Sequence, residues 1–198
     1  MRAQVESSRQ AVLDSAVKAF AGKGYAGTSV QDILQATGLS KPTLYYYFKS
    51  KAGLFRAILD FAYDECFRLM QEAVATASGC EGRLVAVATA FFHFAQRHQD
   101  LTRLVLATVF AAPGEIPGNC IDLSKRRRNF EFVLGIVREA QLSGEIDSRY
   151  NAEEVAHGIF GTISHQVRTH LLMPKGRLDR QRAGRVVALF LDGARKKE

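Results

Sequence analysis

Long apolar runs are missing from this 198-residue sequence, whose hydrophobic share of 47% is ordinary for a globular protein. No segment is long and apolar enough to span a bilayer, and the first ten residues, MRAQVESSRQ, lack the apolar stretch of a signal peptide. These absences speak against a membrane protein. We therefore expect a cytoplasmic protein that does not act at a membrane.

Cysteine and histidine form no pattern typical of a metal site. The three cysteines are an odd number and lie far apart, as expected of unpaired thiols in a reducing compartment. The pairs His93/His98 and His165/His170 have a five-residue spacing, which does not align two ligands on one helical face. A recognisable set of nucleophile, base and orienting residue is absent as well. We therefore expect no cofactor, no metal and no enzymatic activity.

Strand patterns are also absent, because no stretch alternates apolar and polar residues with a period of two. Only four prolines occur, each at a plausible break between helices, and apolar residues recur three and four residues apart. The sequence therefore predicts an all-α fold of about nine helices. We expect a first helix that ends at Gly22 and Gly24, others near 29–38, 40–48, 51–77, 81–98, 100–111 and 119–142, one that begins at Asn151, and one near 178–195.

Positive charge is what the sequence has in excess. The formal net charge is +7 and the pI is near 9.5. This excess favours an anionic partner, but charge alone does not separate nucleic acid from anionic lipid or an acidic ligand.

Two short predicted helices meet at a tight turn that contains Gly38, which is typical of a helix-turn-helix. Residues 40–48, at the start of the stretch SKPTLYYYFKSK, would be the recognition helix, with a serine N-cap and a proline in its first turn. Leu44 and Phe48, four residues apart, would share its inward face with help from Tyr45.

The outward face of that helix would carry Lys41, Thr43, Tyr46 and Tyr47. Hydroxyls, an ammonium group and aromatic rings can contact phosphates, base edges and thymine methyl groups. Lys51 and the N-terminus of the long helix that follows would bind a further phosphate. The alternative is that the tyrosines only cover a hydrophobic core while the lysines solvate its edge.

Residues 11–55 resemble the DNA-binding domain of the TetR family of bacterial transcriptional repressors. The stretch FAGKGYAGTSVQDILQATGLSKPTLYYYFKSKAGLF carries the match: helix-1 phenylalanine, G-Y loop, T-S helix start, G-x-S turn, L-Y-x-Y-F core and following lysine appear in order. The resemblance implies DNA contacts at Thr28, Ser29, Gln31, Ser40, Lys41, Pro42, Thr43, Tyr45, Tyr46, Tyr47 and Lys51. Gln31 and Lys41 are the best candidates for direct base readout, because amide–adenine and lysine–guanine are good geometric pairings.

The resemblance weakens after about residue 60. It implies a helix-turn-helix DNA-binding domain over 1–50 and a C-terminal effector-binding and dimerisation domain over 51–198. Apolar stripes on the last two predicted helices independently indicate a dimer built from four helices. The interface residues that we expect are Ile159, Ile163, Val186, Val187, Phe190 and Leu191. The alternative is that these helices pack against the protomer's own core, and Gly158 and Gly161 allow the close backbone approach that either role needs.

An effector cavity in the C-terminal domain would draw its apolar walls from a rich supply of phenylalanine, with a few polar groups to orient the ligand. The candidate pocket residues are Cys66, Phe92, Phe94, Phe110, Phe132, Phe160, Thr162 and His165. No acidic cluster indicates a pocket for cationic molecules. An apolar or weakly polar effector is therefore favoured.

The run Lys125-Arg126-Arg127-Arg128 is a second concentration of positive charge, far in sequence from the recognition helix. It has three possible roles: a second nucleic-acid site, a contact to an anionic effector such as an acyl-CoA, or a solvated helix face. The third is the commonest role of such a run.

The function that best fits these features is a ligand-responsive transcriptional repressor that binds a palindromic operator as a dimer. A small-molecule effector would favour a conformation in which the two recognition helices no longer match the half-site spacing. An activator has the same contacts, because the sign of regulation depends on where the operator lies. Two further functions fit less well: a structural DNA-binding protein without an effector, and an enzyme whose chemistry lies in the C-terminal bundle.

Overall fold

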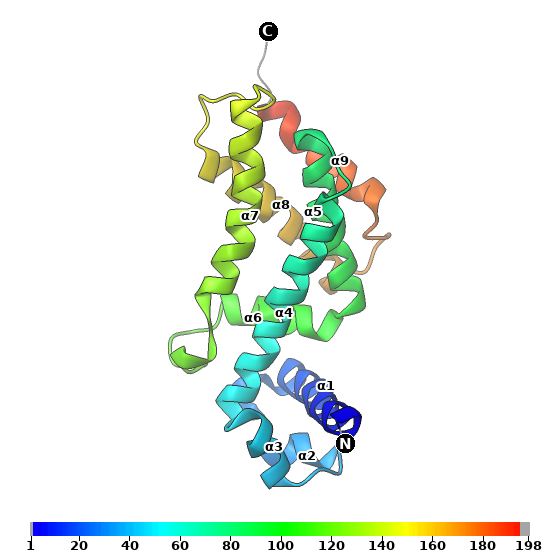
Figure 1. Ribbon diagram of the computed structural model, residues 1–198, viewed down its shortest axis with the longest axis vertical. Helices are drawn as coiled ribbons and strands as arrows, with labels where there is room; N and C mark the ends of the chain where they lie inside the picture. The colour runs from blue at the N-terminus through cyan, green and yellow to red at the C-terminus, as the bar shows by residue number, and fades with distance from the viewer. Residues whose placement is uncertain (1, 195–198) are drawn as a thin grey trace. The chain divides into compact units, whose positions relative to one another are not determined.

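The computed structural model describes residues 2–194, with side chains for 7–118 and 120–193. Every regular element in this range is a helix and none is a strand, which confirms the predicted all-α fold (Figure 1). The helices are α1 (Arg2–Gly27), α2 (Val30–Gln35), α3 (Lys41–Phe48), α4 (Lys51–Val74), α5 (Gly79–Arg97), α6 (Gln99–Val109), the 3₁₀ helix η1 (Gly118–Cys120), α7 (Leu123–Leu142), α8 (Ala152–Leu172) and α9 (Arg180–Ala194). Within 2–194, no helix combines the length and the apolar character needed to cross a membrane.

The chain divides into two compact units. The first unit comprises Met1–Ala62 and Asp100–Leu123, and the second comprises Tyr63–Gln99 and Ser124–Glu198. The helix-turn-helix segment and α6 therefore belong to one unit, whereas α4 begins in the first unit and ends in the second. The domain boundary that the sequence places after residue 50 stays a prediction.

In the first unit, the residues that cap or interrupt the helices are those that the sequence predicts. Ser29 is the N-cap of α2 and makes a reciprocal capping box with Asp32. Ser40 is the N-cap of α3, and Pro42 lies in the first turn. N–H groups in the first turn have no acceptor within the helix, so the missing N–H group of proline costs no hydrogen bond there. At Gly24, φ is 72°, so the regular part of α1 ends there, although helical hydrogen bonding resumes as far as Gly27.

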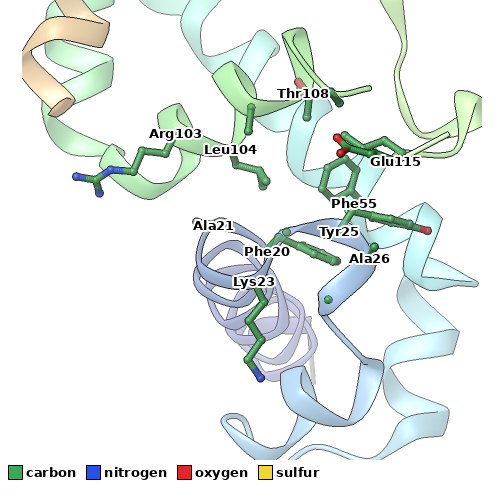
Figure 2. Close-up of a pocket in the computed structure, with 15 residues that line it drawn as sticks. Phe20, Ala21, Lys23, Tyr25, Ala26, Phe55, Arg103, Leu104, Thr108 and Glu115 are labelled. Carbon is green, nitrogen blue, oxygen red and sulfur yellow. The ribbon is translucent and has the colours of Figure 1, made fainter. Parts of the chain in front are cut away.

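The core of the first unit includes an aromatic cluster of Phe20, Tyr25 and Phe55 (Figure 2). The ring of Phe55 meets those of Phe20 and Tyr25 edge-on, with centroid distances of 5.0 Å in both cases. Phe20 and Tyr25 are stacked at 5.9 Å. Edge-to-face and offset-stacked arrangements are the favourable ones for aromatic pairs. The cluster therefore joins the end of α1 to the start of α4.

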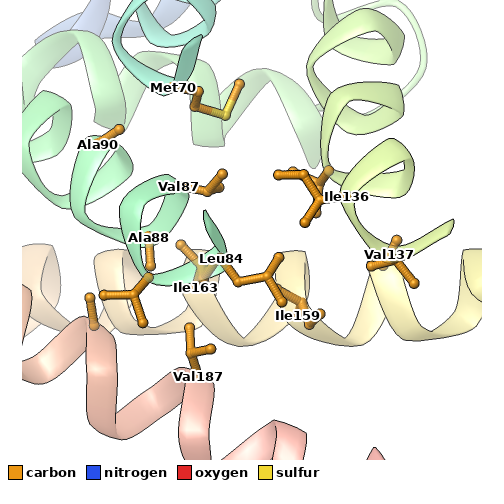
Figure 3. Packing of buried hydrophobic residues seen from close by; sticks show 14 of the residues in the cluster. Met70, Leu84, Val87, Ala88, Ala90, Ile136, Val137, Ile159, Ile163 and Val187 are labelled. Atoms are coloured by element: carbon orange, nitrogen blue, oxygen red, sulfur yellow. The ribbon is translucent and has the colours of Figure 1, made fainter. Parts of the chain in front are cut away.

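The second unit has an apolar core made by α5, α7, α8 and α9 (Figure 3). Leu84 of α5, Ile136 of α7, Ile159 of α8 and Val187 of α9 are all buried in it. α8 begins as predicted, with Asn151 accepting hydrogen bonds from the backbone N–H groups of the first turn. α7 begins later than predicted, because the backbone is extended at 121 after the short 3₁₀ helix.

The junction between α3 and α4 is unusually tight. Lys49 has a φ of 65°, a backbone conformation that residues other than glycine rarely adopt. Ser50 then accepts a hydrogen bond from the Gly53 N–H group at 2.9 Å, as an N-cap does. A Cβ atom added at Gly53 would lie 2.0 Å from the carbonyl oxygen of Phe48. Gly53 is therefore required for this close approach of two backbone segments.

We predict that Gly53→Ala lowers the free energy of unfolding by about 2 kcal/mol or more, because the backbone of the junction must shift to make room. Gly22→Ala is the matched control in the same unit, since nothing lies within 4 Å of a Cβ added there. It should leave stability unchanged or raise it by about 1 kcal/mol through helix propensity. Urea unfolding followed by circular dichroism measures both changes. Equal effects of the two substitutions would contradict the steric argument.

Candidate nucleic-acid interface

The recognition helix α3 presents a polar and aromatic face to solvent. Leu44 and Phe48 are buried, as predicted, and fix the inner side of the helix. Lys41 is exposed, and Tyr46 is the most exposed of the three tyrosines at 72%. Tyr45 is 37% exposed, so it contributes less to the inner face than the sequence analysis expects. This exposure follows from its position four residues after Lys41, whose ammonium group lies 5.9 Å from the Tyr45 ring centroid.

The other two tyrosine side chains form a short row of rings. Tyr46 and Tyr47 meet edge-to-face at 5.2 Å, and Tyr47 meets the buried Phe48 ring at 6.1 Å. Tyr47 is half-buried and thus partly covers the core, whereas Tyr46 does not. The alternative that the tyrosines only cover a core therefore does not apply to Tyr46.

The start of α2 supplies an exposed polar edge. Ser29 and Gln31 are both exposed. The Ser29 hydroxyl donates to Asp32 Oδ2 at 2.6 Å and accepts from the Asp32 N–H group at 3.1 Å. Lys23 lies 2.9 Å from Asp32 Oδ1, and the hydrogen bonds from Lys23 and Ser29 hold the pKa of Asp32 well below its usual range. The N-terminal turn of α2 is thus fixed in place with Gln31 pointing into solvent.

The start of α3 is fixed in a similar way. The Ser40 side chain accepts a hydrogen bond from the Thr43 N–H group at 3.4 Å, and the two hydroxyl oxygens lie 2.8 Å apart. Pro42, between them, is exposed. A ligand that binds this turn therefore meets hydroxyl groups that are already oriented.

Thr28 differs from the role that the family resemblance implies. Its side chain is only 1% exposed, and its hydroxyl lies 2.7 Å from the Gly24 carbonyl oxygen and 3.1 Å from that of Ala19, both acceptors. A buried hydroxyl that already donates to backbone carbonyls has no surface to offer a phosphate. Thr28 closes the end of α1 instead and is not part of the interface that we propose.

Lys51 has internal partners that the sequence analysis did not predict. Its ammonium group donates to the carbonyl oxygens of Tyr25 at 2.8 Å and of Thr28 at 2.9 Å. The same group lies 4.2 Å from the centroid of the Tyr25 ring. Two of its three N–H groups are therefore used within the protein, and at most one is left for a phosphate. No sequence spacing shows this contact, because Lys51 and Tyr25 are 26 residues apart.

The candidate effector residues do not gather in one place. Phe110 lies in the first unit and is exposed, whereas the other seven belong to the second unit. Cys66, Phe92 and Phe94 are buried, and burial raises the pKa of the Cys66 thiol to about 12, which makes it an inert side chain.

The remaining candidates lie on α7 and α8. Phe132 meets Phe67 edge-to-face at 5.6 Å. Phe160 meets Phe91 at 5.1 Å and Phe130 at 6.3 Å. These half-buried rings pack against the core of the second unit. The Thr162 hydroxyl donates to the Gly158 carbonyl oxygen at 2.8 Å, and the exposed His165 ring nitrogen Nε2 lies 3.4 Å from the Thr169 hydroxyl.

The six predicted dimer residues fall into two groups. Four of them are buried within the protomer: Ile159, Ile163, Val187 and Leu191. Val186 and Phe190 are partly exposed, and Leu189 beside them is 79% exposed, a residue that the sequence analysis missed.

Gly158 allows a close contact between α8 and α9 within the protomer. A Cβ atom added there would lie 2.6 Å from the Phe190 ring, so this glycine serves the packing of α9 on α8.

The basic run at the start of α7 is largely paired with acidic side chains. Lys125 lies 2.6 Å and Arg128 3.0 Å from the carboxylate of Asp64, and Arg127 lies 3.4 Å from Glu131. The Arg128 guanidinium also covers the Phe67 ring at 4.2 Å. These pairings favour a solvated helix face over a second nucleic-acid site. Among the side chains that the structure describes, no group of three or more His, Cys, Asp or Glu residues could hold a metal ion.

We predict that Lys51→Met lowers the free energy of unfolding by about 2 kcal/mol, because two carbonyl oxygens lose a charged donor. Lys49→Met is the matched control, since it removes the same charge from an exposed position two residues away. It should change stability by no more than about 0.5 kcal/mol. Urea unfolding checks both values. If the two variants lose the same stability, the internal role of Lys51 is wrong.

Comparisons with known proteins agree with this geometry. Residues 12–58 match the family model described as bacterial regulatory proteins, tetR family. The HTH-type transcriptional repressor ComR of Escherichia coli is 49% identical over 65 residues, which are 33% of this chain and 30% of ComR. The HTH-type transcriptional activator FasR of Mycolicibacterium smegmatis is 28% identical over 111 residues, 56% of this chain and 51% of FasR. The chain thus spans about a third to a half of the length of these curated relatives.

Longer but weaker matches cover most of the chain. The HTH-type transcriptional regulator TtgR of Pseudomonas putida is 23% identical over 184 residues, 86% of this chain and 83% of TtgR. The structure of the transcriptional regulator FadR from Bacillus subtilis in complex with stearoyl-CoA aligns with a TM-score of 0.81 at 22% identity, covering 93% of this chain and 98% of FadR. At this identity the likeness shows a shared fold.

Proposed function

The chain belongs to the TetR family of bacterial regulatory proteins, and from that premise we propose that it is a transcriptional regulator that binds a palindromic DNA operator as a dimer. We propose further that it acts as a repressor, that a small-molecule effector releases it, and that it works in the cytoplasm. Its named relatives are regulators of transcription, which agrees with the expectation that the chain is not an enzyme.

The observation that carries this proposal is the exposed face of α3. Lys41 and Tyr46 project from a helix that is anchored from beneath by Leu44 and Phe48. In a helix-turn-helix, the first residues of the second helix reach base edges in the major groove, while the surrounding polar groups hold phosphates. We propose base readout by Lys41 and, from the neighbouring α2, by Gln31.

The other proposed contacts position the protein on the duplex. Ser29, at the start of α2, and the Ser40–Thr43 turn at the start of α3 would bind phosphate oxygens. The remaining members of this set are Pro42, Tyr45, Tyr46, Tyr47 and the free N–H group of Lys51.

We propose that the protein represses transcription, although its relatives include both repressors and activators. ComR is named a repressor and FasR an activator. The same contacts serve either role, because the sign of regulation depends on where the operator lies relative to the promoter.

The effector that we propose is apolar or weakly polar. FadR of B. subtilis, which shares the fold, was solved in complex with stearoyl-CoA, whose acyl chain is apolar. In this chain, the half-buried rings of Phe132 and Phe160 lie in the second unit with further aromatic neighbours. A ligand that binds among them can release DNA only through a higher affinity for the conformation that does not fit the operator.

The dimer that we propose uses the exposed side of α8 and α9. Val186, Leu189 and Phe190 retain exposed apolar surface, while the other predicted residues support them from within the protomer. A soluble protein gains free energy by covering such surface with a second copy.

We predict that Leu189→Asp converts the dimer to a monomer, because a carboxylate cannot be buried in an apolar interface without a partner. Leu142→Asp is the matched control: Leu142 ends α7 and is 89% exposed, so the same change there should leave the dimer intact. Sedimentation velocity measures the mass of both variants. A dimeric Leu189→Asp, or a monomeric wild-type protein, would contradict the proposed interface.

We predict that the protein binds a site in the DNA that flanks its own gene at least ~10³-fold more tightly than scrambled DNA. Lys41→Ala and Tyr46→Ala should each weaken binding to this site by about tenfold or more. Arg126→Ala is the control, because this exposed arginine lies in the basic run of α7 outside the proposed interface, and it should change affinity less than about twofold.

A salt titration separates contacts to bases from contacts to phosphates. Loss of one phosphate contact reduces the slope of log affinity against log salt by about 0.9. Equal binding to the flanking and scrambled DNA would favour a structural DNA-binding protein, and no binding at low salt would refute the proposed function.

A further inference from the structure

The first unit contains a cavity of about 330 Å³ (Figure 2). It is formed by the end of α1, the start of α4, α6 and the loop that follows α6, all of which belong to this unit. Its lining includes none of the proposed DNA contacts and none of the candidate effector residues. The cavity is therefore separate from the proposed DNA interface and from the candidate effector residues.

The walls of this cavity are largely apolar and aromatic. Phe20, Tyr25 and Phe55 line one side, and Leu104 and Ala107 of α6 line another. The three rings hold one another in edge-to-face and stacked contacts, so this wall is preformed. The volume lies at the lower end of the range of about 300–1,000 Å³ that is typical of small-molecule sites. Such a space suits a molecule of one or two rings.

The charged groups of the three charged side chains in the lining point in different directions. Lys23 is paired with Asp32 at 2.9 Å, and Arg103 with Asp100 at 3.1 Å. Both cationic ends point away from the ring cluster, so these residues contribute only their stems. Glu115 instead extends its carboxylate towards the rings of Phe55 and Tyr25 (Figure 2).

Glu115 therefore supplies a carboxylate acceptor at the cavity. Its Oε2 atom accepts from the Ala112 N–H group at 3.0 Å, which fixes the side chain. A carboxylate has about four lone-pair sites, so one such bond leaves room for a ligand donor. The Thr108 hydroxyl, also in the lining, already donates to the Val105 carbonyl oxygen at 2.6 Å.

From these observations we propose that this cavity binds a small aromatic molecule that carries one N–H or O–H donor. The ring lies against the cluster of Phe20, Tyr25 and Phe55, and the donor binds the carboxylate of Glu115. Such a ligand contacts α1, α4 and α6 at once. It would thus hold α6 against the helices that support the recognition helix, at a site distinct from the proposed effector pocket.

Indole is a suitable probe, because it has two rings and one N–H group. The protein contains no tryptophan, so indole fluorescence can be excited selectively in its presence. We expect the emission of indole to shift to shorter wavelength as protein is added, with saturation at one indole per chain. Indene has the same shape without the N–H donor. As a competitor of indole, it should require at least fivefold higher concentrations than an indole analogue that keeps the N–H group. The measurement uses no DNA, so its outcome is independent of the proposed regulatory function.

Two variants test the placement. Ala107→Phe adds a ring at the cavity wall from an exposed position on α6 and should abolish the shift. Val109→Phe, on the same helix but outside the lining, is the matched control and should keep it. Glu115→Leu should bind indole and indene equally. No shift with the wild-type protein, an unchanged shift with Ala107→Phe, or an indole preference that survives in Glu115→Leu would overturn the proposal.

Discussion

The arrangement of the DNA-binding helices depends on the ammonium group of Lys51. It binds the Tyr25 and Thr28 carbonyl oxygens, which lie at the end of α1 and just before α2. Carbonyl groups at a helix C-terminus carry partial negative charge and lack helical donors, so a cation is the natural partner there. Because Lys51 is also the first residue of α4, one side chain joins both ends of the segment that contains α2 and α3. The tight junction at Lys49 and Ser50, which requires Gly53, keeps the connection between α3 and α4 short.

Features that depend on near neighbours in the chain could be predicted from the sequence. The capping box of Ser29 and Asp32 spans three residues, and the buried pair Leu44 and Phe48 spans four. Side chains at these spacings meet on any α-helix, whatever the rest of the fold is. The starts of α2 and α3, the buried pair of α3 and the exposure of Tyr46 follow from such local rules. The buried pair of α3 and its exposed Tyr46 could therefore be predicted without knowledge of any tertiary contact, whereas Tyr45, expected on the inner face, is 37% exposed.

Features that depend on distant partners could not be predicted in this way. Thr28 has a hydroxyl that suits a phosphate, and only its burial against the end of α1 shows that it is used internally. Lys125 and Arg128 form a basic run in the sequence, but Asp64 on α4 neutralises much of it from more than 60 residues away. Apolar stripes have the same ambiguity: Ile159 and Val187 are buried within the protomer, whereas Leu189 is not. Periodicity identifies an apolar face but not its partner.

The start of α4 is coupled directly to the helix-turn-helix segment. Sharp bends in helices occur almost always at proline, at glycine–serine pairs or at bulges. After Gly53, α4 has no glycine or proline up to its end at Val74. Its first residue is Lys51, and its last turns belong to the second unit, which holds the proposed effector pocket. Within the first unit, a rotation of the first turns of α4 would either displace the Lys51 ammonium group from its two carbonyl partners or carry the end of α1 with it. The Lys51 hydrogen bonds and the contacts of the Phe55 ring with Phe20 and Tyr25 both join the start of α4 to the end of α1, so the two segments that flank the recognition helix are coupled to each other.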